Sequence, residues 1–224
     1  PYPQDQAPIE RALESDDTVR VSQGEFLLFE PVDRPAAQGL IFYPGGKVDP
    51  VAYAPVLREL AREGLLVVVT PMPLKTAFLG VDRADEAMAA FPQIQTWYLG
   101  GHSLGGVAAS LYAEHAAEKL QGLLFWASYP VADLSALELP VLSIYARGDV
   151  QTTREEIADN HELLPADTRY IEIEGNHWQF GHFSSDLHQV PPAVSRSEQQ
   201  AAIVSATLDF TGGRYSPHAR PADQ

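Results

Sequence analysis

Two kinds of hydrophobic pattern alternate along this chain. Short continuous apolar runs, such as residues 65–69 and 122–126, lack the polar positions of a half-buried strand. Such runs are typical of strands that are covered on both faces, as in a parallel sheet. The pattern predicts strands at residues 26–29, 40–43, 65–69, 96–99, 122–126, 141–146 and 168–173.

The segments between these runs carry apolar residues at helical spacing. Asp49 followed by Pro50 signals a helix start, and Gly64 ends the apolar stripe that follows. Strands that alternate with helices require crossover connections, so the pattern predicts a three-layer α/β fold with a mostly parallel central sheet and helices on both faces. The helices are predicted at residues 49–64, 82–91 and 104–120, with two more that open at the capping boxes Thr153–Glu156 and Ser195–Glu198.

The alternation covers one stretch of the chain without a repeat or a low-complexity linker. It predicts a single domain over residues 21–211. Residues 1–20 are expected to form a loosely held arm, because the first part is rich in Pro, Gln, Asp and Glu, with a short helix around Ile9 to Leu13. Residues 212–224 are expected to form a flexible tail.

Charge and composition exclude several classes of function. The chain has 224 residues and a net charge of −15, and its few lysines and arginines form no run. Nucleic acid is therefore not an expected partner, because binding to phosphate backbones depends on clustered basic residues. The absence of cysteine excludes disulfides, thiolate metal sites and a cysteine nucleophile.

No apolar run in the chain is long enough to span a membrane, which takes roughly 20 residues. The sequence begins at Pro1 without a methionine. We therefore expect that an upstream segment was removed, and that the protein is secreted or membrane-anchored through it, or otherwise cytoplasmic.

Residues 100–106, Gly-Gly-His-Ser-Leu-Gly-Gly, follow a predicted strand and precede a predicted helix. This is the context of the Gly-X-Ser-X-Gly nucleophile elbow, in which Ser103 attacks and the amide of Leu104 faces a developing oxyanion. Gly101 and Gly105 satisfy the steric demand of the tight turn. The alternative is a glycine-rich turn that only packs strand against helix.

A serine hydroxyl needs a base and an orienting acid. Asp149 and His177 each follow a predicted strand, at the same sheet edge as Ser103. They are the predicted acid and base. His182 is the fallback base, and Asp133 or Glu155 are the substitutes for the acid.

The remaining histidines near His177 and Ser103 are not interpreted as metal ligands. His182, Asp186 and His188 lie close together in sequence, but their spacing fits no helical pair of zinc ligands. His102 is expected to pack within the turn. We therefore predict neither a metal nor a cofactor.

The loop after the strand at 40–43 is expected to supply the second oxyanion donor. Its sequence, Tyr-Pro-Gly-Gly-Lys, lets a backbone amide approach a substrate, and Gly46 is the preferred donor, with Lys47 next. Tyr129 and Trp178 are predicted to line the substrate site. The alternative is that these aromatic side chains belong to the core.

At these motifs the chain resembles the α/β-hydrolase superfamily, from about residue 26 to residue 210. The segments 43–50 (Tyr-Pro-Gly-Gly-Lys-Val-Asp-Pro) and 175–181 (Gly-Asn-His-Trp-Gln-Phe-Gly) are similar to a group of small, lidless hydrolases akin to the dienelactone hydrolases. The resemblance implies a triad of Ser103, His177 and Asp149. True dienelactone hydrolases use a cysteine nucleophile, so the resemblance does not extend to their substrate.

In many superfamily members a cap domain follows the sixth strand, but here the connection 127–140 is too short for one. The resemblance therefore implies an open site and a small-molecule ester as partner. We expect a serine carboxylesterase for small or medium esters. The alternatives are a hydrolase of lipidic or polymeric esters, and a catalytically silent binding protein on the same fold.

Overall fold

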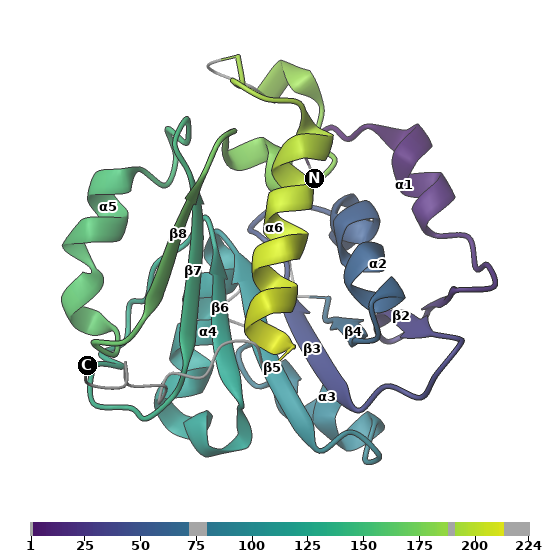
Figure 1. Ribbon diagram of the computed structural model, residues 1–224, viewed down its shortest axis with the longest axis horizontal. Coiled ribbons are helices and arrows are strands. Elements are labelled where there is room, and N and C mark those ends of the chain that lie inside the picture. Colours follow the sequence, from purple (N-terminus) through teal and green to yellow (C-terminus); the bar gives the residue numbers. More distant parts are fainter. Residues whose placement is uncertain (1, 72–79, 188–190, 213–224) are drawn as a thin grey trace, which may run out of the picture.

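The computed structural model describes residues 2–71, 80–187 and 191–212, in which eight strands form one sheet (Figure 1). The strands are β1 (Val19–Gln23), β2 (Leu27–Pro31), β3 (Gln38–Tyr43), β4 (Leu66–Val69), β5 (Thr96–His102), β6 (Gly122–Trp126), β7 (Val141–Ala146) and β8 (Arg169–Ile173). Their order in the sheet is β1-β2-β4-β3-β5-β6-β7-β8. β1 and β2 pair antiparallel, and every pairing from β4 to β8 is parallel.

Helices cover both faces of the sheet, which confirms the predicted three-layer α/β architecture (Figure 1). One face carries α2 (Ala54–Arg62) and α6 (Arg196–Thr211), and the other carries α3 (Arg83–Ala90) and α4 (Leu104–Ala116). α1 (Gln6–Ala12) packs against α2, and α5 (Arg154–Asp159) lies beyond the outer strand β8.

The side chains of each central strand divide between two cores. In β4, Val67 and Val69 pack with α2 and α6, whereas Leu66 and Val68 pack with α3 and α4. Successive side chains of a strand point to opposite faces, so a strand between two helical layers must be apolar throughout. This is why residues 65–69 show no polar alternation.

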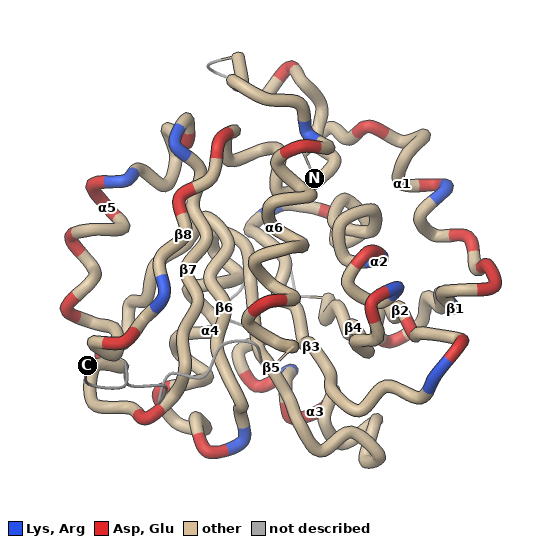
Figure 2. The backbone as a smooth tube through the Cα atoms, viewed as in Figure 1, with Lys and Arg blue, Asp and Glu red and all other residues tan. Residues whose placement is uncertain are grey.

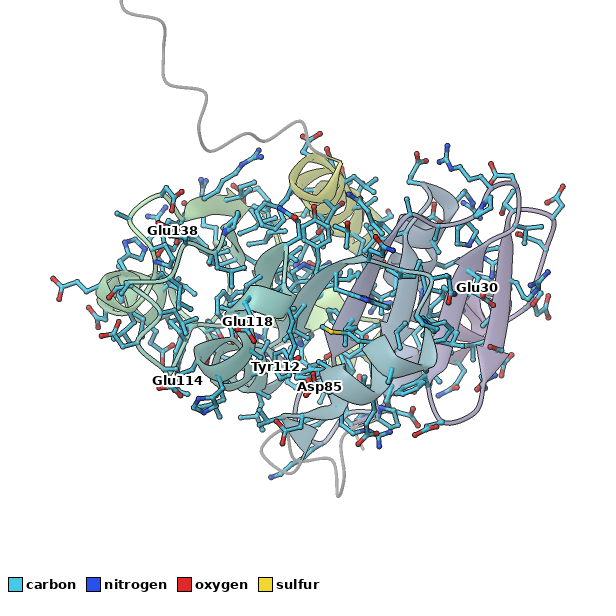
Figure 3. The ribbon with its side chains drawn as sticks, turned by 90° about the horizontal axis from the view of Figure 1, so that it is seen from below. Glu30, Asp85, Tyr112, Glu114, Glu118 and Glu138 are labelled. Atoms are coloured by element: carbon cyan, nitrogen blue, oxygen red, sulfur yellow. The ribbon has the colours of Figure 1, made fainter. Side chains whose placement is uncertain are left out.

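A hydrogen bond between α3 and α4 joins the two helices of the second face. The Tyr112 hydroxyl donates to Oδ1 of Asp85 at 2.6 Å, and Lys119 Nζ donates to the same oxygen at 2.8 Å. Figure 3 shows Tyr112 and Asp85 side by side. Because α4 begins directly after Ser103, contacts that fix α4 also fix the turn at its start.

The N-terminal residues differ from the expected loosely held arm. Val19–Gln23 is a strand that pairs with β2 and buries Val19 completely, although the arm was expected to reach residue 20. α1 forms near the expected helix, and its Ile9 is buried. The arm is held by contacts with residues distant in sequence, which a local pattern of polar residues does not reveal. The expected tail lies outside the described residues from 213 onward.

The connection between β6 and β7, residues 127–140, contains no helix or strand and therefore no cap domain. Charged residues lie mainly on the outer helices and loops, while the central strands are free of them (Figure 2). Within the described part of the chain, none of the helices has the length and apolarity that crossing a bilayer requires.

Candidate active site

The turn between β5 and α4 has the geometry expected of an elbow. Ser103 has φ 52° and ψ −123°, a conformation that side-chain-bearing residues rarely adopt. A methyl group on Gly101 would overlap the backbone of Gly105, and one on Gly105 would overlap the carbonyl of Tyr43. Glycine is therefore required on both sides of the serine.

Four hydrogen bonds hold the strained serine in place. Its N–H donates to the carbonyl of Trp126 in β6 at 3.0 Å. Its carbonyl accepts from the hydroxyl of Ser128 at 2.7 Å, and from the amides of Gly106 and Val107 at 3.0 and 3.3 Å. The backbone is thus fixed by neighbouring elements, while the side chain projects at the N-terminal end of α4, where the helix dipole favours negative charge.

His177 and Asp149 form a buried pair in the loops after β8 and β7. His177 Nδ1 lies 2.8 Å from Oδ2 of Asp149. The other oxygen, Oδ1, accepts the amides of Gln151 and Thr152, each at 2.8 Å. A carboxylate only accepts hydrogen bonds, so Nδ1 must donate and the free lone pair of a neutral His177 is on Nε2.

The loop that carries His177 is fixed by the last helix. His177 opens η6 (His177–Phe180), and the side chain of Asn176 caps it by accepting the amides of residues 178 and 179. The side chain of Gln199 in α6 donates to the carbonyl of Asn176 and accepts its amide, both at 2.9 Å. The amide of Gly148 donates to the carbonyl of Gly175 at 3.0 Å, which joins the acid loop to the base loop.

Ser103 and His177 line one cavity of about 120 Å³. The residues around it come from five separate parts of the chain, which the fold brings to the carboxyl ends of the parallel strands. They are Tyr2, Gly45, Gly46, Val48, His102, Ser103, Leu104, Gln151, His177 and Trp178.

The two predicted oxyanion donors lie next to each other in this cavity. A Cβ on Gly46 would lie 2.9 Å from Cδ2 of Leu104, so the two residues are in contact. The following residue, Lys47, is in the left-handed region with φ 59°. The amide of Gly45 donates to the hydroxyl of Tyr53 at 3.1 Å, which holds this loop against the helix that follows it.

His102 is buried beneath the cavity, as expected for a residue packed within the turn. Its Nδ1 lies 2.8 Å from the Tyr53 hydroxyl, and its ring packs against that of His177, with centroids 4.5 Å apart. The Tyr53 hydroxyl therefore contacts both the amide of Gly45 and the ring of His102. Burial, and then the neighbouring His177, keep the pKa of His102 well below its ordinary value, so the ring is neutral at pH 7.

The alternatives to the predicted pair are engaged elsewhere. His182 lies 3.2 Å from Gln200 Oε1 and 3.3 Å from Arg196 Nη1, and it is not among the residues that line the cavity. Asp133 is exposed and accepts from the backbone and hydroxyl of Ser135. Glu155 is exposed in the first turn of α5.

Of the two aromatic residues predicted for the substrate site, Trp178 lines the cavity and Tyr129 does not. The chain leaves β6 through Ala127, whose φ of 44° turns the backbone so that Ser128 contacts the elbow. Tyr129 is then half-buried outside the lining. Its role in substrate binding stays a prediction.

Several lining residues were not predicted from the sequence. Val48 and Gln151 each lie within two residues of a predicted site residue, so the motifs pointed to their loops. Tyr2 comes from the polar arm, and no local signal places it near the serine. His102 was considered only as a packing residue, which its burial bears out, but its ring also contacts His177.

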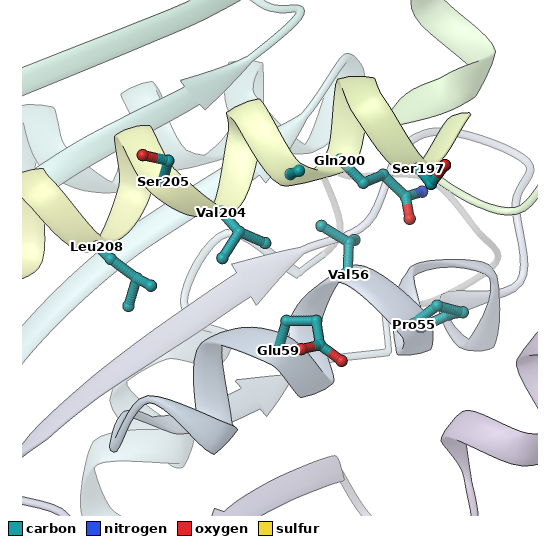
Figure 4. Close-up of a pocket in the computed structure, with 9 residues that line it drawn as sticks. Pro55, Val56, Glu59, Ser197, Gln200, Val204, Ser205 and Leu208 are labelled. Atoms are coloured by element: carbon teal, nitrogen blue, oxygen red, sulfur yellow. The ribbon is translucent and has the colours of Figure 1, made fainter. Parts of the chain in front are cut away.

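A larger cavity of about 580 Å³ lies between α2 and α6 (Figure 4). Val56 of α2 faces Val204 of α6 across it. The described residues that line it include two serines but no histidine, so it holds no nucleophile–base pair. Within the ranges that the structure describes, no three side chains of His, Cys, Asp or Glu form a group that could hold a metal ion, and His188 falls outside these ranges.

Known proteins provide an independent comparison. One solved structure with the same fold is that of MGS-MChE2, an α/β hydrolase enzyme from the metagenome of sediments from the lagoon of Mar Chica, Morocco. It is 18% identical in sequence, with a TM-score of 0.58 over 76% of this chain and 94% of that one. No curated protein matches this chain. The sequence model of the α/β hydrolase family matches residues 39–201, which is well over half of the chain. This protein therefore belongs to the α/β hydrolase family.

Proposed function

We propose that this α/β hydrolase is a serine carboxylesterase that acts on small esters through an acyl-enzyme on Ser103. The observation that carries the proposal is the cavity that both the strained Ser103 and the oriented His177 line. Within the family we assign it to the small, lidless, dienelactone-hydrolase-like group with serine in place of cysteine, which the absence of a cap after β6 supports.

In the first half of the proposed reaction, Nε2 of His177 removes the proton from Ser103 as its oxygen bonds to the ester carbonyl carbon. The carbonyl oxygen becomes an anion, which the amides of Leu104 and Gly46 stabilise. The intermediate then breaks its bond to the alcohol oxygen. The alcohol leaves with the proton that His177 had accepted, and the acyl group stays on Ser103.

In the second half, water takes the place of the alcohol. His177 removes a proton from the water as its oxygen bonds to the acyl carbon, and then returns that proton to Ser103 as the carboxylic acid leaves. Asp149 accepts a hydrogen bond from Nδ1–H of His177 throughout. It thereby fixes the tautomer that a base at Nε2 requires and stabilises the charged imidazolium between the steps.

The size of the cavity favours small substrates over lipidic or polymeric ones. Its volume of about 120 Å³ lies below the 300–1,000 Å³ of cavities that enclose drug-sized ligands. A volume of this size holds roughly four water molecules at their liquid volume. A short acyl or alcohol group fits within it, and a long chain has to extend beyond it.

The test is the covalent labelling of the serine. We expect a fluorophosphonate to add once to the wild-type protein, as measured by intact mass, and not to Ser103→Ala. The Ser103→Ala and His177→Ala variants should lose roughly 10⁴-fold to 10⁶-fold in kcat with p-nitrophenyl acetate.

His115→Ala is the matched control, because this histidine is exposed on α4 and its contact is with the neighbouring Glu114. It should keep wild-type turnover and labelling. Wild-type turnover in purified Ser103→Ala would exclude this mechanism. A wild-type protein that neither labels nor hydrolyses any ester of a broad panel would instead indicate a binding protein.

A further inference from the structure

The N-terminal segment, residues 2–5, crosses beside the candidate active site and is held there by its backbone. The amide of Tyr2 donates to the carbonyl of Lys47 at 3.2 Å, and the amide of Asp5 donates to the carbonyl of His182 at 2.9 Å. Between them, Gln4 forms an antiparallel bridge with Phe183, and the carbonyl of Pro3 accepts from Ser184 at 2.9 Å. The segment therefore connects the oxyanion loop to the loop that follows η6.

Side chains of the segment also hold it in this position. The carboxylate of Asp5 accepts from Arg196 of α6 at 3.2 Å, and the side-chain nitrogen Nε2 of Gln4 donates to the carbonyl of Asp49 at 3.4 Å. The ring of Tyr2 packs edge-on against Trp178, with the ring centroids 4.9 Å apart and the planes at 69°. Such an edge-to-face pair is a favourable arrangement of two aromatic rings.

Tyr2 lines the same cavity as Ser103 and His177, but it differs from the other walls. Trp178 is buried, Gly46 lies in the loop that follows β3, and Leu104 opens α4. Tyr2 is 37% exposed, and its ring packs against that of Trp178. A smaller side chain at position 2 would therefore enlarge the cavity without removing a piece of the core.

We propose that Tyr2 is a specificity-determining residue, whose ring closes the cavity beside Trp178 and restricts the enzyme to esters with a short chain on that side. The proposal rests on the proposed esterase function and names its substrate class. In this reading Tyr2 does not take part in the bond-making steps. It limits how far the acyl or alcohol chain extends from the carbonyl that Ser103 attacks.

The experiment measures selectivity rather than activity. The kcat/KM values of wild type, Tyr2→Ala and Tyr2→Phe are compared on p-nitrophenyl esters of two to eight acyl carbons, and on acetate esters of alcohols of increasing length. We expect Tyr2→Ala to raise the ratio of long-chain to short-chain kcat/KM by about tenfold in one of the two series, mainly through a lower KM. Tyr2→Phe keeps the ring and should keep the wild-type ratio.

Val32→Ala is the matched control, since Val32 is an exposed apolar residue that follows β2 at the opposite edge of the sheet. It should not change the ratio. If the role of Tyr2 were only structural, Tyr2→Ala would lower turnover of all esters by the same factor, and an unchanged ratio in both series overturns the proposal. Fluorophosphonate labelling of every variant shows separately whether Ser103 is still activated.

A readout that does not depend on catalysis separates failure of this proposal from failure of the esterase function. Acetamide and hexanamide are unreactive analogues of short and long acyl groups, and their binding to Ser103→Ala is measured by NMR titration with and without Tyr2→Ala. If Tyr2→Ala tightens the binding of hexanamide but not of acetamide, Tyr2 restricts chain length, even if the protein hydrolyses no ester. N-hexylacetamide, which extends on the alcohol side, is titrated in the same way. Equal binding of both long amides in the two backgrounds overturns the proposal.

Discussion

Three residues other than glycine adopt a positive φ within the described part of the chain, and they surround the candidate active site. Lys47 follows β3, Ser103 follows β5, and Ala127 follows β6, so each lies where a parallel strand ends. Such conformations cost on the order of 1–3 kcal/mol each, and they persist only where the surrounding contacts fix them. The strained positions are therefore concentrated at the sheet edge that carries the proposed chemistry.

The crowding at the elbow predicts that the stability of the protein depends strongly on Gly105. A methyl group there would overlap the carbonyl of Tyr43, which belongs to the backbone of β3 and cannot rotate away. We expect Gly105→Ala to lower the free energy of unfolding by about 1–3 kcal/mol or more, as other overpacked sites do. Urea denaturation followed by circular dichroism measures this change.

Gly24→Ala is the control for that variant, because a methyl group at Gly24 has no atom within 4 Å. It should unfold at the wild-type urea concentration. Equal midpoints for both variants would show that the elbow tolerates a larger residue, contrary to the steric argument.

At the scale of elements, a single buried arginine joins α1 to α2. The guanidinium of Arg58 donates to the carbonyls of Ala12 and Glu14 at 3.0 and 2.6 Å, and pairs with Asp16 at 2.6 Å. Arg58 is only 6% exposed. Ala12 is the last residue of α1 and Glu14 lies just beyond it, so the arginine donates to carbonyls at the helix end, where intrahelical donors run out.

Replacing Arg58 should loosen the first helix. Arg58→Met keeps an apolar stem but removes every donor, and we expect a loss of about 1.5–3 kcal/mol of unfolding free energy, since the carbonyls remain partly buried. Hydrogen exchange should rise first in residues 6–23. Arg62→Met, on the exposed side of the same helix, removes only a surface pair with Glu59 and should change stability by less than about 1 kcal/mol. A similar loss in both variants would show that Arg58 contributes no more than a surface charge.

Most strands and helices were predictable because their signal is local. A continuous apolar run, a capping box or an Asp-Pro start requires only neighbouring residues, and the strands β2 to β8 all overlap a predicted run. β1 was missed because Val-Arg-Val-Ser-Gln is short, half polar and preceded by a polar arm. β1 becomes buried because it pairs with β2. The end of α1 is held by Arg58, which lies more than 40 residues away in the sequence.

The candidate site likewise contains residues with a local sequence signal and residues without one. Ser103, His177 and Asp149 were predicted because each lies in the turn or loop that follows a strand. The structure places the serine and the histidine in one cavity, and the aspartate within hydrogen-bond distance of the histidine. Their catalytic roles stay predictions. Tyr2 was missed, and Tyr129 does not line this cavity, because a cavity wall depends on how loops turn, which neither spacing nor residue type encodes.

For the whole molecule, acidic residues cover the outer helices and loops, and the net charge is −15 (Figure 2). Several groups in the described structure have shifted pKa values, and two of them, His182 and Asp16, make stability depend on pH in different ranges. Burial, and then the nearby Arg196, lower the pKa of His182 to about 4 from an ordinary value of 6.5. Hydrogen bonds from Thr18, and then from the amides of Val19 and Thr18, lower the pKa of Asp16 below its ordinary 3.8.

The sign is the same for both groups. His182 is neutral when folded and takes up a proton more readily when unfolded, so its contribution is complete above pH 6.5 and is lost as the pH falls toward 4. Asp16 stays ionised when folded, and its contribution is lost only below about pH 4. The unfolding free energy should therefore decrease in two stages on acidification.

Measuring the free energy of unfolding as a function of pH isolates the first stage, which His182 is expected to cause. In urea denaturation between pH 7 and pH 4, His182→Gln should show a shallower decrease than wild type, because the glutamine side chain has no proton to take up. His115→Gln, at an exposed position on α4, should keep the wild-type slope. Identical slopes for wild type and His182→Gln would exclude His182 as a source of the acid sensitivity.

The position of Tyr2 has a consequence for how this scaffold acquires new substrates. Most walls of the cavity are loops that also determine the placement of the serine, the histidine or the oxyanion donors, so mutations there alter reactivity together with selectivity. Residues 2–5 bind mainly through backbone hydrogen bonds, which do not depend on the identity of the side chains. Directed evolution of substrate range is therefore best begun by randomising this short stretch, where sequence is free to diverge while the catalytic geometry is conserved.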